Sequence, residues 1–147
     1  MKKLIGHCGV DSGQLMIADP CYIAEQWDNT DNFDDTRKLK DIKTGKVYQY
    51  RVDFENYDSN LIDGKSVNEL VLEKRLVELP NKGTGNFSYG GACGETLSEE
   101  RAGQLNYKLG HAGAGVVFAS GYGDGFYPVY AHYNKEGRII KVEIIMK

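Results

Sequence analysis

The sequence has little cysteine and little proline, three residues of each among 147. Cys8, Cys21 and Cys93 are an odd number of widely spaced thiols, which argues against a disulfide framework and for reduced cysteines. No apolar run approaches the ~20 residues that a membrane helix needs, and the apolar stretch near the N-terminus is too short for a signal peptide. These absences predict a cytoplasmic protein that has no membrane partner.

An excess of basic charge is also missing. Lys and Arg number 18 against 21 Asp and Glu, which gives a net charge of −3. A protein that binds the nucleic-acid backbone needs a basic surface, so we expect no nucleic-acid partner. A small pocket could still be locally basic, which leaves nucleotides open as ligands. The length and the 41% hydrophobic content fit one domain with a core, so we predict a single domain over residues 1–147.

The sequence contains many short apolar segments. In them, apolar residues alternate with polar residues or form brief runs between turn residues, which is typical of strands. A Lys-Thr-Gly turn at residues 43–45 predicts a hairpin, because Gly45 can adopt a positive φ. We expect strands at residues 2–10, 14–19, 114–121, 126–134 and 138–146, and a hairpin over residues 37–52.

Helical signals are few and short. Residues 21–27 can form about one turn, and Ser66 to Glu69 has the form of a capping box, which predicts a helix from about Val67. The following residues fit both helical spacing and strand alternation. We also expect a short helix that opens at residues 98–101 and ends near Gly110. The predicted fold is strand-dominated α+β, an antiparallel sheet or a partly closed β-barrel with two or three short helices.

Glycine is abundant in two places. The stretch GYGDG at residues 121–125 lies between two predicted strands. A dinucleotide-binding fingerprint would need a helix after the glycines, so a Rossmann fold is excluded. Two interpretations remain. Asp124 binds local amides in a tight bend, or the loop presents bare amides and one carboxylate to a ligand. Residues 81–95 are a second glycine-rich stretch, long for a loop and therefore either functional or partly strand.

The residues that could carry catalysis or bind a metal are scattered. Asp11 and Asp19 flank one predicted strand, and eight strand residues span ~26 Å, so the two cannot share a proton or a metal. Cys21 or Cys93 could form a nucleophile–base pair with His7, His111 or His132, and Cys93 at its glycine-rich bend is the better candidate, but the sequence does not show which of them are neighbours. The acidic stretch 28–35 lacks the glycine and glutamate of a calcium loop, and zinc spacing is absent. We therefore expect no cofactor and no metal.

Ten tyrosines are a large aromatic content for this length. Strand alternation places Tyr127 and Tyr133 on one face of their strand, and Tyr130 and His132 on the other. One set is expected in the core. The other could stack on a flat ligand such as a nucleobase.

Taken together, the stretches DSGQLMIADPCYI, FSYGGACGETLS and SGYGDGFYPVYAHYNKEGRIIKVEI resemble an uncharacterised family of small bacterial and phage proteins. The resemblance covers residues 9–23 and 86–145, whereas residues 28–85 match nothing. It implies a β-rich fold and no established activity. It also implies that the following residues belong together, as a site or as a fold signature: Asp11, Gly13, Asp19, Pro20, Cys93, Gly123, Asp124, Gly125 and Tyr127.

The sequence thus predicts a non-catalytic protein that binds a small molecule, with a nucleotide-like ligand favoured. By analogy alone, a phage-type protein of this kind could sequester a host immune signalling nucleotide. Glycine amides would approach ligand oxygens, Tyr122 or Tyr127 would stack, and Asp124 would accept hydrogen bonds. Two alternatives are a hydrolase or transferase that uses Cys93 or aspartates, and a protein-interaction module that inhibits a host enzyme. Homo-oligomerisation is left open. The candidate ligand-binding residues are Asp11, Asp19, Tyr89, Cys93, Gly121, Tyr122, Gly123, Asp124, Gly125 and Tyr127.

Overall fold

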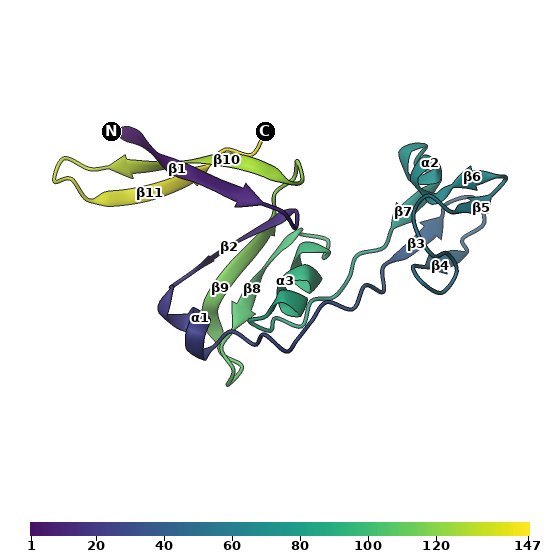
Figure 1. Ribbon diagram of the computed structural model, residues 1–147, viewed down its shortest axis with the longest axis horizontal. Coiled ribbons are helices and arrows are strands. Elements are labelled where there is room, and N and C mark those ends of the chain that lie inside the picture. Colours follow the sequence, from purple (N-terminus) through teal and green to yellow (C-terminus); the bar gives the residue numbers. More distant parts are fainter.

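The computed structural model describes residues 1–147 and confirms the predicted fold class (Figure 1). It is strand-dominated, its sheets are antiparallel, and it has no closed barrel. None of its three helices has the length and apolarity to cross a membrane. The helices are α1 (Cys21–Glu25), α2 (Val67–Leu72) and α3 (Tyr89–Thr96). The strands are β1 (Lys2–Val10), β2 (Gln14–Ala18), β3 (Lys38–Asp41), β4 (Val47–Gln49), β5 (Asn60–Ile62), β6 (Lys65–Ser66), β7 (Leu76–Glu78), β8 (Ala102–Asn106), β9 (Ala112–Ala119), β10 (Gly125–Tyr133) and β11 (Ile139–Ile144).

Two three-stranded sheets form the body of the molecule. One has the order β1-β10-β11 and the other β2-β9-β8. The chain passes between the sheets twice, through the turn after β1 and through the loop after β9. Figure 1 shows both connections at the same corner, from which the two sheets diverge.

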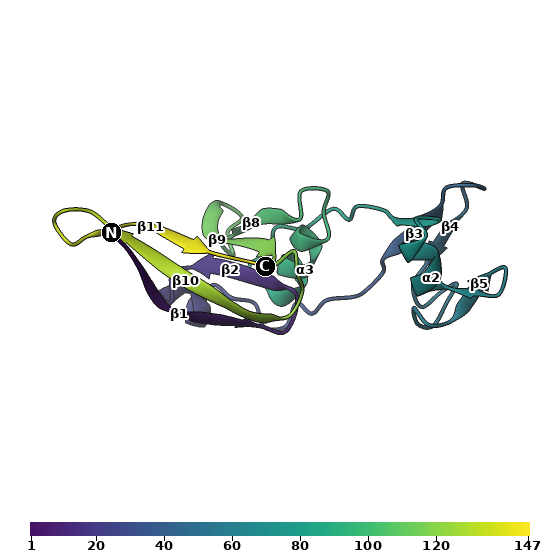
Figure 2. The same ribbon diagram turned by 90° about the horizontal axis from the view of Figure 1, so that it is seen from above.

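Residues 38–78 form a separate lobe, which we call the insert lobe. It contains β3 to β7 and α2, and two extended segments join it to the body (Figures 1 and 2). The predicted hairpin is present as β3 and β4, and the predicted capping box of Ser66 and Glu69 opens α2. The insert lobe has its own hydrophobic cluster, which consists of Leu39, Phe54, Val67, Leu70 and Leu76.

The body has a second hydrophobic cluster that shares no residue with the first. It lies between α3 and the β2-β9-β8 sheet and consists of Phe87, Ala92, Leu105, Ala114 and Val117. Strand β9 supplies the buried middle of this sheet, because it pairs with β2 on one side and β8 on the other. The β1-β10-β11 sheet contributes no residue to either cluster.

Two local expectations were wrong or incomplete. The helix expected over residues 98–110 is instead a turn followed by β8, which pairs with β9. The glycine-rich residues 81–95 were expected to be a functional loop or partly a strand. Their second half is instead helical, because Tyr89–Thr96 form α3 with Ser88 as its N-cap. The residues after Val67 that fit both helical spacing and strand alternation form a helix and then a strand, since α2 ends at Leu72 and β7 begins at Leu76.

Candidate functional site

The corner between the two sheets is held by hydrogen bonds between residues far apart in sequence. The Asp124 carboxylate accepts the Gly13 amide at 2.9 Å across 111 positions. The carbonyl of Gly13 in turn accepts from the amide of Ser120 at 2.8 Å. The turn at residues 11–13 and the loop at residues 120–125, which we call the corner loop, are therefore fixed to one another.

The corner loop is exposed although it is fixed. Residues 121–124 are all exposed, and none of their four amides donates a hydrogen bond within the protein. Gly121 and Gly123 have φ of 76° and 81°, and no atom lies near the position a Cβ would take. These glycines are needed for the left-handed backbone and not for close packing. The side chain of Tyr122 is 72% exposed beside them.

Tyr127 is a buried residue that hydrogen-bonds to the backbone of the corner loop. It is only 4% exposed, and its hydroxyl donates to the Gly123 carbonyl at 2.6 Å. Ser120, 1% exposed, donates to the same carbonyl at 2.7 Å. Of the two tyrosines predicted to stack on a ligand, only Tyr122 is exposed to solvent. Sequence reasoning missed Ser120, because a serine at a strand end carries no distinguishing signal.

The second predicted stretch, around Cys93, reaches the corner through Gln14, the residue after the turn. The Gln14 side chain donates to the Cys93 sulfur at 3.4 Å and accepts from the Thr96 hydroxyl at 2.9 Å. Tyr89 lies one helical turn before Cys93, and the charge of the thiolate, followed by burial, raises the pKa of Tyr89. Gln14 therefore links Cys93 and Thr96 of α3 to the turn at residues 11–13, whereas no hydrogen bond joins Tyr89 to the corner loop.

The glycines of α3 differ from those of the corner loop. Gly90 donates its amide to the Asp31 carbonyl and Gly91 donates to the Ser88 hydroxyl, at 2.9 and 2.8 Å. A Cβ on Gly91 would overlap the carbonyl of Asn86. These glycines permit close backbone packing, and their amides are already bound. The amides of Gly90 and Gly91 are therefore not free for a ligand, whereas those of residues 121–124 are.

The two N-terminal aspartates lie at opposite ends of β2, as expected. Asp11 is exposed in the turn, and its side chain makes no hydrogen bond within the protein. Asp19 accepts the Cys21 amide at 3.0 Å where α1 begins, and this hydrogen bond lowers the pKa of Asp19. Asp19 thus belongs to the start of α1, and Asp11 to the corner.

Cys93 has no general base beside it. The thiol is 7% exposed and contacts Gln14, and none of the three histidines hydrogen-bonds to it. His111 stacks on Tyr107 with ring centroids 4.5 Å apart. No group of three or more His, Cys, Asp or Glu side chains is arranged to hold a metal. The geometry therefore supplies no nucleophile–base pair from these residues.

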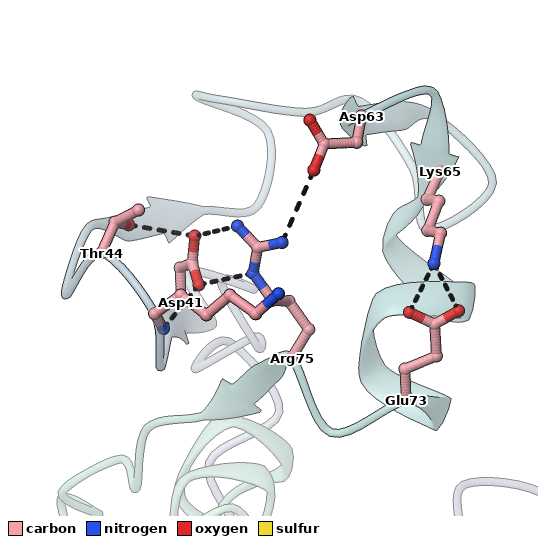
Figure 3. Close-up of polar contacts among 7 residues, drawn as sticks. Asp41, Thr44, Asp63, Lys65, Glu73 and Arg75 are labelled. Carbon is pink, nitrogen blue, oxygen red and sulfur yellow. Dashed lines mark hydrogen bonds and ion pairs between the residues drawn. The ribbon is translucent and has the colours of Figure 1, made fainter.

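The insert lobe contains a polar cluster that the sequence did not indicate (Figure 3). Asp41, 1% exposed, accepts from Arg75 Nε at 2.8 Å and Nη2 at 3.0 Å, and also from Thr44. Arg75 lowers the pKa of Asp41 well below its usual range, and Lys65 binds Glu73 through both carboxylate oxygens. Arg75, Lys65 and Glu73 line a cavity of about 260 Å³, but Arg75 already pairs with Asp41, and Lys65 with Glu73. The cluster holds β3 against the start of β7.

The fold and the corner define a small strand-dominated protein with an exposed, hydrogen-bonded glycine loop and an inserted lobe. A family model described as "Protein of unknown function (DUF4241)" matches residues 7–144, and the chain belongs to this family. The match also spans the insert lobe. No curated protein and no solved structure matches the chain.

Proposed function

We propose that the protein is a non-catalytic binding protein, and that the corner loop binds a flat, nucleotide-like small molecule. One observation carries the proposal. Residues 121–124 present four unpaired amides next to the exposed ring of Tyr122, on a loop that hydrogen bonds hold from beneath. A loop ordered in advance loses little conformational entropy on binding, which favours affinity.

The corner residues have different roles in this proposal. Tyr122 stacks on the ring of the ligand, and the amides of residues 121–124 donate to its acceptor atoms. Tyr127 and Ser120 hold the Gly123 carbonyl and do not touch the ligand. Asp124 uses one carboxylate oxygen on Gly13, so its main role is to position the loop.

Charge selects which part of a nucleotide meets the loop. Asp11 and Asp124 both lie at the corner, and each is a carboxylate that repels a phosphate group. Neutral acceptors, such as the carbonyl oxygens and ring nitrogens of a nucleobase, meet no such repulsion. The amides are therefore expected to read the base edge, with any phosphate directed away from the corner.

The test is a thermal-shift screen with nucleosides, mononucleotides and cyclic dinucleotides, followed by calorimetry on compounds that raise the melting temperature. Tyr122→Ala should abolish the shift without lowering the melting temperature of the free protein, because the ring is exposed. Leu109→Ala is the matched control, since Leu109 is 92% exposed on another loop. A panel that produces no shift, or a shift that Tyr122→Ala leaves intact, would reject the proposed site.

A binding protein that does not transform its ligand lowers the free concentration of that ligand. The recovered ligand should therefore be chemically unchanged, with one molecule bound per chain at saturation. Chromatography of the ligand after prolonged incubation checks this directly. Conversion of the ligand that Cys93→Ala abolishes would instead support the enzymatic alternative.

A further inference from the structure

The chain exposes more surface than its mass predicts. Its accessible surface is 9703 Å², whereas a compact monomer of 16.4 kDa exposes ~7,500 Å². The separate insert lobe explains part of the difference. Treating the lobe and the body as two compact units raises the expected area to ~8,900 Å². The two extended segments that join the lobe to the body add further exposed surface (Figures 1 and 2).

Exposed aliphatic side chains gather on β11. Ile139, Ile140 and Val142 are 54%, 67% and 55% exposed in this six-residue strand. The strand belongs to the sheet that lies outside both hydrophobic clusters. It is also an edge strand, because it pairs with β10 only, so its outer backbone groups have no partner strand.

The sequence of β11 is complementary to itself in an antiparallel pair. Its residues 140–144 read Ile-Lys-Val-Glu-Ile, an apolar residue at the centre and both ends with one cation and one anion between. Two copies that pair about Val142 place each Lys141 opposite the partner's Glu143. They also place each Ile140 opposite the partner's Ile144. Both apolar pairs lie on one face, and both ion pairs on the other.

We propose that the protein is a homodimer in which the β11 strands of two copies pair antiparallel about a two-fold axis at Val142. The two sheets then form one sheet of six strands, and the interface is isologous, as closed two-fold symmetry requires. Lysines on edge strands usually prevent edge-to-edge pairing. Lys141 lies 3.2 Å from the Glu143 carboxylate of its own chain, and the partner's Glu143 adds a second anion opposite it, so Lys141 does not prevent this pairing. The dimer does not depend on the ligand of the corner loop.

The first measurement is the mass in solution, by light scattering after size-exclusion chromatography over a dilution series. The expected mass is twice 16.4 kDa at the higher concentrations. A monomer at every concentration would overturn the proposal.

Charge reversal tests the register. Lys141→Glu alone and Glu143→Lys alone each place two like-charged pairs across the interface, so each should weaken dimerisation about tenfold. Mixing the two single variants restores both opposite-charge pairs, and a heterodimer should form. Lys3→Glu, the same charge change on the other edge strand of this sheet, is the control and should leave the dimer intact.

Within the chain Glu143 also binds Lys2 and Lys141, so both single variants need a check that they fold. A heterodimer on mixing shows that both variants are folded and that the charges face each other. The double variant Lys141→Glu/Glu143→Lys should also dimerise. A dimer that none of the single variants weakens, or single variants that stay monomeric when mixed, would reject this pairing.

Discussion

Leu70→Ala in the insert lobe should unfold that lobe and leave the body folded. Leu70 is 1% exposed in the five-residue cluster of the lobe, and no residue of that cluster belongs to the body. Truncation of a buried leucine to alanine costs about 2–5 kcal/mol. A unit as small as residues 38–78 rarely holds more than about 3–5 kcal/mol of its own stability. The substitution therefore removes most or all of it.

Hydrogen exchange measured by mass spectrometry gives the assay, because it reports protection segment by segment. Peptides from β3 and β7 should lose protection in Leu70→Ala, while peptides from β8 and β9 keep theirs. Leu105→Ala, at a fully buried position in the body cluster, is the matched control and should deprotect β8 and β9. Equal loss of protection across the whole chain in both variants would refute the reasoning and show one cooperative unit.

Three further predictions concern single contacts. Gly91→Ala should destabilise the protein by about 3 kcal/mol in chemical denaturation, because the new methyl group overlaps a backbone carbonyl; an unchanged midpoint would contradict this packing. Asp124→Ala should cost about 1 kcal/mol by loss of the acceptor for Gly13 and should also weaken ligand binding; intact binding would show that the loop needs no such support. The pKa of Asp41 is lowered by Arg75, so its stabilising effect is complete above the ordinary carboxyl range near pH ~4 and is lost as the pH falls through the folded value. An acid titration of lobe unfolding should therefore lose this component in Asp41→Asn, and identical acid transitions would rule the contribution out.

Much of the fold could be predicted from local patterns. Strands β1, β2, β9, β10 and β11 were all predicted, and alternation supported β2, β10 and β11, whose residues face two different environments across a sheet. The capping box located the start of α2, because both of its hydrogen bonds are local in sequence. Such signals involve residues within a few positions of one another, which is why one sequence suffices for them.

Helix α3 could not be predicted in this way. Glycine and alanine fill its packed face, so it has no pattern of large apolar residues, and the glycines resembled a loop. Close packing against the carbonyl of Asn86 explains Gly91, but that contact exists only in three dimensions. The wrong helix over residues 98–110 has a related cause, since pairing with β9 outweighed a weak helical signal.

The candidate site was predicted in part. The resemblance grouped Gly13 with Asp124, and the structure joins them by a hydrogen bond. Gln14 and Ser120 complete the contacts at the corner; both lie in the stretches that carry the resemblance, yet neither was among the residues it grouped, since their residue types give no signal of this role. Asp19 lies at the far end of β2 and takes no part in the corner.

The central claim is that the amides of the corner loop are a ligand-binding surface. The most direct measurement is a nuclear magnetic resonance titration of the nitrogen-15-labelled protein with nucleosides and nucleotides. The claim predicts that the amide signals of residues 121–124 shift together and saturate, and that Tyr122→Ala abolishes the shifts. Signals in this loop that stay unchanged throughout the titration, or that move only in other parts of the chain, would contradict it.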